Sequence, residues 1–247
     1  MTDSIDEERN IELIQERIKR ACERVGRNPD EVQLLLATKT VSPERINRAI
    51  HSGATLIGES RAQELAEKYD KIDYKDAELH FIGHLQTNKV NQVLRYTSFI
   101  HSVDRMRLAN RLHRRLTNLN RKIDILIQVN TSYEESKFGV KPEDAIELIE
   151  EVSKLDTLQI KGLMTIGKLS SDPDEARQCF RLLKEIQQEV IEKEIPGVEM
   201  DILSMGMSDD FEIAVEEGST MVRIGTSVFG ERMYPDSCYW NEKAEID

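Results

Sequence analysis

The chain has 247 residues, of which 39% are hydrophobic and 32% are charged, and its formal net charge at pH 7 is −12. This composition is typical of a globular protein in water, and no segment has the length and apolarity of a membrane span. The negative charge argues against binding a phosphate backbone, so we expect neither a nucleic acid nor a membrane as a partner.

The N-terminal segment, residues 5–24, is predicted to form a long amphipathic helix. It is acidic at its start and has neither the basic region nor the apolar region of a signal peptide. Cys22, Cys179 and Cys238 are odd in number and widely spaced, which argues against a disulfide framework or a zinc site. We therefore expect reduced thiols and a cytoplasmic protein.

Strand-like segments follow this helix, and helix-like segments separate them. The expected strands are Val32–Lys39, Thr55–Gly58, Leu79–Leu85, Phe99–Val103, Asp124–Asn130, Gln159–Gly167, Met200–Met205 and Met221–Phe229. The expected helices include Pro43–His51, Ala62–Tyr69, Arg105–Asn118, Pro142–Lys154, Asp174–Lys193 and Asp210–Glu217. Strands that alternate with helices indicate a parallel sheet, and eight such units predict closure into a (β/α)8 barrel.

One barrel occupies roughly 200–250 residues, so we expect a single domain over residues 1–247. The segment after Phe229 is short and ends in a polar tail, residues 231–247, which leaves too little chain for an eighth helix of ordinary length. We expect the N-terminal helix to cover that gap. The competing fold, an open doubly wound sheet, is disfavoured because Thr40-Val41-Ser42-Pro43 follows the first strand in place of a GxGxxG loop.

Lys39 ends the first apolar strand and is the first candidate site residue. Burial lowers the pKa of a lysine, and an uncharged amine is a nucleophile that forms a Schiff base with an aldehyde. The alternative is a lysine that extends its side chain to solvent at the strand end.

The loops after the last two strands carry the residues of a phosphate site. In a barrel these loops commonly hold a phosphate group. Ser208 is expected to cap the helix after strand 7, where backbone N–H groups receive an anion. Gly225 allows close approach of a phosphate after strand 8, and Thr226 adds a hydroxyl donor. An ordinary cap and an ordinary bend are the alternatives. With Lys39, these loops suit a sugar-phosphate aldolase or a pyridoxal-phosphate protein.

Other polar residues fall near the same end of the expected barrel. His80, His84 and His101 lie at or near strands 3 and 4, where they could serve as acid–base groups or ligands. His84 is the best placed of the three, with a hydrogen bond to a neighbouring loop as its structural alternative. The histidines have no partner at metal-binding spacing, so we expect no metal site. Lys137 follows strand 5 and is either a second acceptor for an aldehyde or a solvated side chain.

Several longer motifs share one family resemblance. They are Leu36-Ala37-Thr38-Lys39-Thr40, Gly58-Glu59-Ser60-Arg61-Ala62-Gln63-Glu64, His80-Phe81-Ile82-Gly83-His84-Leu85-Gln86-Thr87-Asn88-Lys89, Ile100-His101-Ser102-Val103-Asp104, Gln128-Val129-Asn130, Ser136-Lys137-Phe138-Gly139, Gly162-Leu163-Met164-Thr165, Leu203-Ser204-Met205-Gly206-Met207-Ser208-Asp209-Asp210-Phe211 and Arg223-Ile224-Gly225-Thr226-Ser227-Val228-Phe229-Gly230. With these motifs the sequence, from about residue 32 to 232, resembles the pyridoxal phosphate homeostasis proteins of the YggS or PROSC type. That family is related to the barrel domain of alanine racemase.

The resemblance implies a barrel that carries pyridoxal 5′-phosphate (PLP) as a Schiff base on Lys39. Ser208, Gly225 and Thr226 match the family's phosphate contacts. Arg223 matches the arginine that faces the pyridine nitrogen.

Two further positions belong to the same implied site. Met205 matches a residue near the cofactor. Ser60, followed by Arg61, departs from the family, which usually has asparagine and then tyrosine there. Since serine is shorter than asparagine, we expect Ser60 to reach the cofactor ring through water.

Arg223 bears on the chemistry that the implied site supports. An arginine stays protonated, so it donates to the pyridine nitrogen, keeps that nitrogen unprotonated and weakens the ring as an electron sink. This argues against carbanion chemistry; the alternative role is a structural salt bridge at the barrel rim. Racemization stays chemically permitted, although we expect the chain to lack the second domain that gives alanine racemase its opposite base.

The sequence therefore predicts a PLP-binding protein of cofactor homeostasis that buffers or delivers PLP, with no dedicated catalytic residue. Expected partners are PLP-dependent apoenzymes and amino acids, and the expected state is a monomer or weak dimer. The alternatives are a slow amino-acid racemase and a regulatory module that responds to PLP. Turnover of an amino acid distinguishes the first, and a partner specific for the loaded form distinguishes the second.

Overall fold

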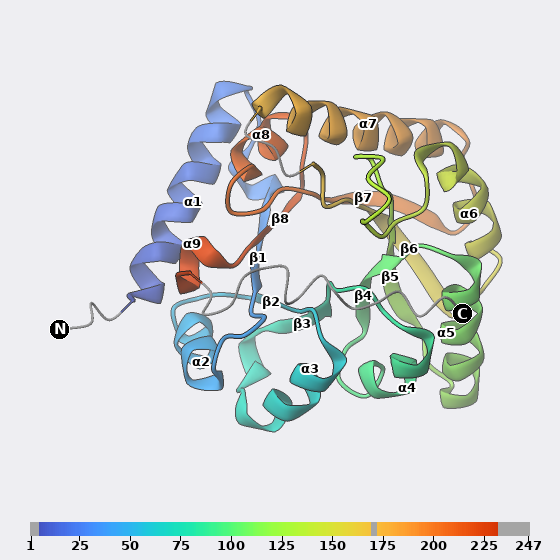
Figure 1. Ribbon diagram of the computed structural model, residues 1–247, viewed down its shortest axis with the longest axis horizontal. Helices are drawn as coiled ribbons and strands as arrows, with labels where there is room; N and C mark the ends of the chain where they lie inside the picture. Colours follow the sequence, from blue (N-terminus) through green and yellow to red (C-terminus); the bar gives the residue numbers. More distant parts are fainter. Residues whose placement is uncertain (1–4, 169–171, 232–247) are drawn as a thin grey trace.

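The computed structural model describes residues 5–168 and 172–231, and its centre is a closed barrel of parallel strands (Figure 1). The strands pair in chain order, and β8 pairs with β1 to close the ring. They are β1 (Gln33–Ala37), β2 (Leu56–Glu59), β3 (Glu78–Phe81), β4 (Phe99–Val103), β5 (Ile123–Gln128), β6 (Leu158–Met164), β7 (Val198–Ser204) and β8 (Met221–Ile224). The predicted (β/α)8 barrel is confirmed.

The strands are buried on both faces, as in other parallel sheets covered by helices. All residues of β2, β4 and β8 are buried, so buried and exposed positions do not alternate along these strands. The main core lies between the strands and the surrounding helices and includes Phe81, Phe180 and Phe211.

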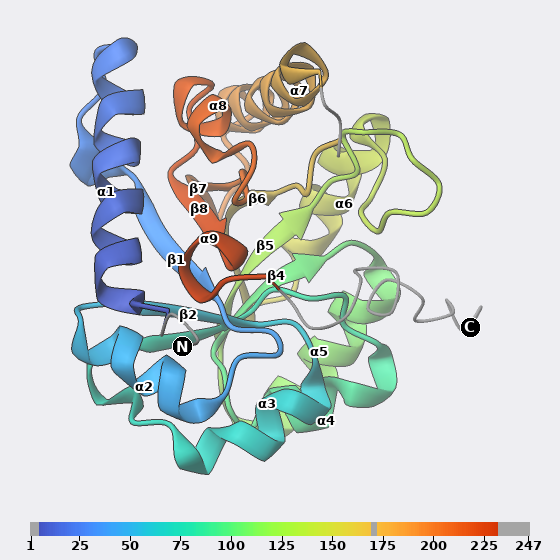
Figure 2. The same cartoon turned by 60° about the vertical axis from the view of Figure 1, so that its left-hand side comes forward.

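The helices surround the barrel (Figure 2). They are α1 (Glu7–Arg24), α2 (Pro43–His51), α3 (Ala62–Lys68), α4 (Val90–Val93), α5 (Met106–Leu119), α6 (Ala145–Val152), α7 (Pro173–Glu192), α8 (Phe211–Glu216) and α9 (Thr226–Phe229). Short 3-10 turns lie at Pro29–Glu31, Tyr69–Lys71, Tyr74–Asp76, Thr87–Lys89 and Pro142–Asp144.

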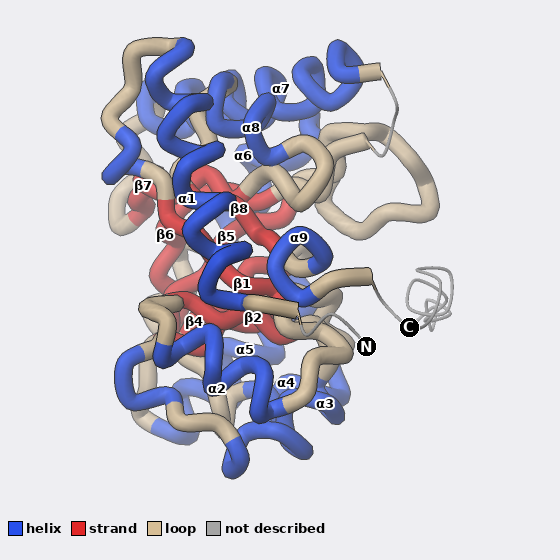
Figure 3. The backbone as a smooth tube through the Cα atoms, turned by 90° about the vertical axis from the view of Figure 1, so that its left-hand side faces the viewer, coloured by secondary structure: helices blue, strands red, loops and turns tan. Residues whose placement is uncertain are grey.

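Helix α1 covers the junction between the first and last β/α units, as the sequence predicts. It contacts α2, α8 and α9 (Figure 3). The amide of Asn10 donates to the carbonyl oxygen of Val228 at 3.0 Å, and Arg17 forms an ion pair of 2.7 Å with Glu212. At the N-terminal end of α1, the carboxylate of Glu7 accepts from Arg45 and Arg48 of α2. The helix therefore takes the place of a full eighth helix.

Several predicted strands extend past their observed ends: β3 ends at Phe81 instead of Leu85, and β6 ends at Met164 instead of Gly167. Strand β1 ends at Ala37, so Lys39 follows the strand instead of ending it. Strand β8 ends at Ile224, and the apolar run up to Phe229 forms α9 instead, because the chain turns at Gly225. The polar tail lies outside the described residues from position 232 onward.

Cys22 and Cys179 are buried free thiols, as expected, and Cys238 lies outside the described residues. Within residues 5–168 and 172–231, no helix combines the length and apolarity needed to cross a membrane.

Candidate functional site

Lys39 lies in a tight turn at the C-terminal end of the barrel and is half-buried, less so than a strand-end position implies. The next residue, Thr40, has a φ of +66°, which is a strained conformation for a β-branched residue. Its N–H donates to the carboxylate of Glu64, and the N–H of Val41 donates to the carbonyl oxygen of Thr38 at 3.0 Å. Contacts on both sides of Lys39 therefore fix the backbone that carries the amine.

A buried ion pair supports this turn. Glu59 is fully buried at the end of β2 and accepts from the hydroxyl of Thr38 at 2.7 Å. The amine of Lys68 lies 3.1 Å from the Glu59 carboxylate and donates to the Thr38 carbonyl oxygen at 2.9 Å. Burial raises the pKa of Glu59, while the charge of Lys68 acts in the opposite direction. This pair was not predicted from the sequence. The one sequence feature that points to it is a glutamate at the end of a buried strand.

Ser60 follows β2 and lies against the loop after β3. A Cβ on Gly83 would lie 2.0 Å from the carbonyl oxygen of Ser60, so only glycine fits at position 83 without backbone movement. The N–H of Ile82 also donates to the carbonyl oxygen of Glu59 at 2.9 Å. The loops after β2 and β3 are therefore in direct backbone contact, and that contact positions Ser60 at the barrel mouth.

Ser208, Gly225 and Thr226 come together in the loops after β7 and β8, but Ser208 does not cap the next helix. Helix α8 begins two residues later than predicted for such a cap, with Asp210 at its N-cap position. The hydroxyl of Ser208 instead accepts from the N–H of Ser227, in the first turn of α9, at 3.4 Å. Gly225 precedes α9, and a Cβ there would lie 3.1 Å from the carbonyl oxygen of Ala37. The expected phosphate residues thus lie beside the end of β1.

Met205 is fully buried where β7 gives way to this loop. Its N–H donates to the carbonyl oxygen of Met221 at 3.1 Å. The next residue, Gly206, has a φ of +93°, and its carbonyl oxygen accepts from the N–H of Arg223 at 3.0 Å. These bonds hold the start of the β7 loop against β8.

Arg223 lies inside the barrel, 5% exposed, and is not a rim salt bridge. Its guanidinium donates to the hydroxyl of Ser204 at 2.8 Å and to the carbonyl oxygen of Thr165 at 2.7 Å. Among the described residues, no carboxylate forms an ion pair with it. Burial lowers the pKa of Arg223 to about 10, against the charge of Asp210, so the group stays cationic at neutral pH.

His80 and His101 are buried in the barrel interior, so the expectation that they lie at the mouth is wrong. Nδ1 of His80 lies 2.8 Å from Nε2 of His101. His84 does lie among the loops: its ring stacks on Phe138 with centroids 3.6 Å apart, and Nδ1 lies 3.8 Å from the carboxylate of Asp104. Burial lowers the pKa of His84, and Asp104 opposes that effect. Within the described ranges, no group of three metal-ligating side chains occurs.

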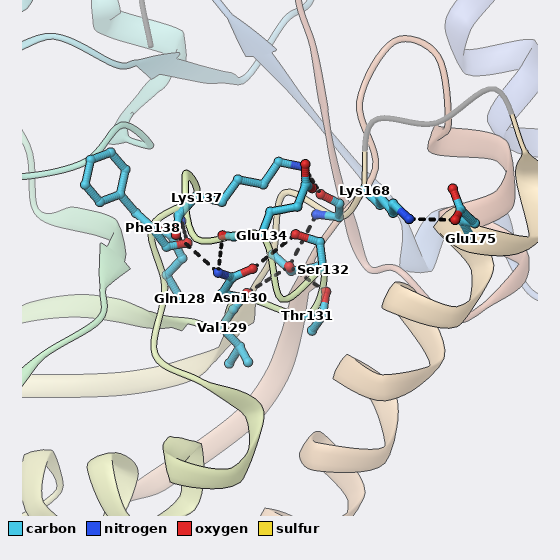
Figure 4. A network of polar contacts seen from close by, with 12 residues as sticks. Gln128, Val129, Asn130, Thr131, Ser132, Glu134, Lys137, Phe138, Lys168 and Glu175 are labelled. Carbon is cyan, nitrogen blue, oxygen red and sulfur yellow. Dashed lines mark hydrogen bonds and ion pairs between the residues drawn. The ribbon is translucent and has the colours of Figure 1, made fainter. Parts of the chain in front are cut away.

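Lys137 is held by its neighbours instead of being solvated (Figure 4). Its amine donates to the carbonyl oxygen of Gly167 at 2.6 Å and forms an ion pair with Glu134. The amide of Asn130 donates to the carbonyl oxygens of Glu134 and Lys137, which closes the loop after β5 on itself. Lys137 therefore joins the loops that follow β5 and β6.

The mouth of the barrel contains the amine of Lys39 on its turn, the buried guanidinium of Arg223, and a set of hydroxyl and N–H donors. The amine follows β1, the cation belongs to β8, and the donors follow β7 and β8, which are neighbours in the barrel. Such a set can bind an anionic aldehyde and hold an aromatic nitrogen as a hydrogen-bond acceptor.

The chain is similar to known proteins in sequence and in fold. Residues 10–233 match the family model for the alanine racemase N-terminal domain. The chain is 46% identical over 224 residues to the pyridoxal phosphate homeostasis protein of Aquifex aeolicus (strain VF5), a match that covers 91% of this chain and 97% of the relative.

Two solved structures are also similar. One is an unknown protein from Bifidobacterium adolescentis, with a TM-score of 0.87, 35% identity, and coverage of 90% of this chain and 94% of that one. The other is PipY of Synechococcus elongatus PCC7942 with PLP bound, with a TM-score of 0.76, 32% identity, and coverage of 87% and 100%.

Proposed function

The chain belongs to the pyridoxal phosphate homeostasis proteins, within the alanine racemase N-terminal domain family, and from this premise we propose that it binds PLP at the barrel mouth. The proposal includes a Schiff base on Lys39 and reversible loading, so that the protein buffers PLP or delivers it to apoenzymes in the cytoplasm. The PLP-bound PipY structure supports the choice of cofactor.

The observation that carries the proposal is the buried guanidinium of Arg223 one strand away from the turn of Lys39. Its hydrogen-bond partners are two neutral oxygens, and a buried cation with no carboxylate paired to it among the described residues favours a further acceptor. A pyridine nitrogen is such an acceptor. The residues present therefore fit the cofactor: Arg223 for the ring nitrogen, Lys39 for the aldehyde, and Ser208, Gly225 and Thr226 for the phosphate.

When bound, PLP supplies an aldehyde that condenses reversibly with a primary amine. The chain's own residues orient and retain it. The fixed turn presents the amine of Lys39, the loops after β7 and β8 supply donors to an anion, and Ser60 and Met205 line the mouth. Arg223 would donate a hydrogen bond to the ring nitrogen while keeping its own proton and charge, so it would hold that nitrogen unprotonated and disfavour carbanion chemistry. This favours a carrier over an enzyme.

The test uses the full chain loaded with PLP. Borohydride reduction followed by peptide mapping should place the label on Lys39, and Lys39→Ala should hold no covalent label. Lys137→Ala is the matched control, because Lys137 is the other lysine considered as an acceptor, and it should keep the label on Lys39. A label on a different lysine in the parent protein contradicts the assignment.

A second measurement separates carrier from enzyme. The loaded protein is incubated with single L-amino acids, and the products are analysed by chiral chromatography. We expect no turnover of any amino acid. We also expect the loaded protein to reactivate a PLP-dependent apoenzyme. Repeated racemization by the parent protein would replace the carrier by an enzyme.

A further inference from the structure

A line of buried polar side chains crosses the barrel interior from Arg223 to Glu78. Arg223 donates to the hydroxyl of Ser204 at 2.8 Å, and that hydroxyl lies 3.3 Å from Nδ1 of His101. Nε2 of His101 lies 2.8 Å from Nδ1 of His80, whose Nε2 lies 3.5 Å from the carboxylate of Glu78. Ser204 belongs to β7 and His101 to β4, which are not neighbours in the sheet, so the line spans the barrel.

The line leads from the candidate site to the opposite end of the barrel. Ser204 and His101 are fully buried, and His80 is 2% exposed. Glu78 is the first residue of β3, and its side chain is 55% exposed. At 3.5 Å the last contact is longer than a standard hydrogen bond. The buried Nε2 of His80 has no other polar partner among the described residues, so Glu78 is its nearest acceptor.

The chemistry of the groups fixes the direction of these contacts. Arginine only donates, so the Ser204 oxygen accepts and its O–H points to Nδ1 of His101. Burial, together with the charge of Arg223, keeps the pKa of His101 well below its ordinary value, so this histidine is neutral. A neutral histidine that accepts at Nδ1 carries its proton on Nε2. His101 therefore donates to His80, which in turn directs its Nε2–H toward Glu78.

The charges at the two ends favour the same direction. Every donor points away from the cation and toward the carboxylate, and hydrogen bonds aligned in this way polarise one another. The contact with His80 lowers the pKa of Glu78, so the carboxylate end is charged at neutral pH.

Other charged groups face the two ends without joining the line. Asp210 acts on Arg223 at the mouth. At the opposite end, Glu78 and His80 influence the pKa of the Asp124 carboxyl in opposite directions. Lys161 forms an ion pair of 2.7 Å with Glu199 there.

We propose that Ser204, His101, His80 and Glu78 are positioning residues for Arg223. The line holds the guanidinium in one orientation toward the mouth, and it transmits a change of charge at Glu78 to the site across the barrel. The role of Arg223 toward a ring nitrogen rests on the proposed function, whereas the line itself is a property of the chain without cofactor.

The first test therefore uses the cofactor-free protein. Nitrogen-15 NMR of the histidine rings should show the proton of His101 on Nε2, and in His80 a proton on the Nε2 that faces Glu78. Glu78→Gln weakens the terminal acceptor and should raise the fraction of Nδ1–H in His101 above that of the parent. Glu199→Gln is the matched control: it removes the same charge at the same end of the barrel, from a side chain 56% exposed, and should leave both tautomers unchanged. An Nδ1–H tautomer of His101 in the parent, or equal shifts in the two variants, overturns the inference.

The second test uses the PLP-loaded protein. Ser204→Ala should weaken PLP retention by about 10-fold, because the guanidinium loses its hydroxyl acceptor. Ser204→Thr keeps the hydroxyl and should restore most of the retention. Glu78→Gln should change the visible absorption of the bound cofactor in the parent but not in the Ser204→Ala background. Unchanged retention and absorption in Ser204→Ala contradict the positioning role. A parent that binds no PLP overturns the proposed function, and the histidine tautomers still decide this inference.

Discussion

The amine of Lys68 lies 3.1 Å from the carboxylate of Glu59, and both side chains are buried next to the turn that carries Lys39. Lys68 comes from α3 and Glu59 from β2, so the pair connects a helix to the barrel wall. Because Thr38 also bonds both groups, the geometry of the Lys39 turn depends on the pair.

Lys68→Met should destabilise the fold strongly, because it leaves the carboxylate of Glu59 buried without its cation. Breaking such a pair costs about 3–5 kcal/mol of the free energy of unfolding. Urea denaturation measures the loss. Lys71→Met, an exposed lysine three residues away, should change stability by less than about 0.5 kcal/mol. The double variant Glu59→Gln with Lys68→Met should recover part of the loss; a Lys68→Met protein as stable as the parent contradicts the prediction.

Glu7 should make stability depend on pH. Burial raises the pKa of Glu7, but hydrogen bonds from Arg48 and Arg45 outweigh it and hold the pKa below its ordinary value of 4.5. A lowered pKa in the folded state stabilises above the unfolded-state pKa, and this contribution is lost as the pH falls through the folded-state pKa. Glu7→Gln should therefore cost roughly 1–3 kcal/mol at pH 7, by loss of charge-assisted hydrogen bonds.

The pH series is the measurement that checks the role of Glu7. The difference in unfolding free energy between parent and Glu7→Gln should stay constant from pH 8 down to about 5 and shrink below about 4.5. Glu8→Gln, at an exposed neighbouring position, should show no such difference. A difference that grows as the pH falls contradicts the assigned sign.

Gly83→Ala should disturb the mouth through the backbone of Ser60. The added Cβ would lie 2.0 Å from the Ser60 carbonyl oxygen, so one of the two loops has to move. Such crowding costs typically about 1–3 kcal/mol. We expect both a lower midpoint of thermal unfolding and weaker PLP binding. Ser60→Ala is the control for the side chain, since it keeps the backbone contact and should leave stability unchanged. Equal behaviour of the two variants would show that the contact is unimportant.

Ser208→Ala and Thr226→Val test the phosphate loops. Hydrogen bonds to a charged group contribute about 1.5–3 kcal/mol, so each variant should weaken PLP binding by about 10- to 100-fold. Binding of pyridoxal, which has no phosphate, should be the same in both variants and the parent. Fluorescence titration with the two ligands measures this. Equal losses for PLP and pyridoxal would place the effect elsewhere than on the phosphate.

The barrel was predictable because its signals are local. Strand β4 and helix α2 have the predicted bounds, since the segment Phe99–Val103 begins and ends with apolar residues and Ser42-Pro43 is a typical helix start. The end of β8 was not predictable from the sequence. Val228 and Phe229 continue the apolar pattern after Gly225, and that pattern does not distinguish a strand from a short helix.

The candidate site was predictable in part for a similar reason. Lys39 stands out because a charged residue follows an apolar strand, whereas Arg223 was identified through the family resemblance. Lys68 does not stand out in the sequence, because a lysine on an amphipathic helix is typical of a surface residue. Its burial against Glu59 depends on the closed barrel. The contact between Ser204 and His101 joins residues 103 positions apart, and no local pattern encodes it.

The placement of α1 has a consequence for synthesis on the ribosome. This helix is translated before the strands of the barrel, yet its partners Val228 and Glu212 lie 218 and 195 positions from Asn10 and Arg17. Contacts between such distant residues form slowly, because the loop that joins them must first close. Until α8 and α9 have been translated, α1 lacks these two partners, and its apolar residues Ile11, Ile14 and Ile18 are incompletely covered. Attachment of α1 should thus be among the last folding events, and the nascent protein should need protection from aggregation along this apolar face.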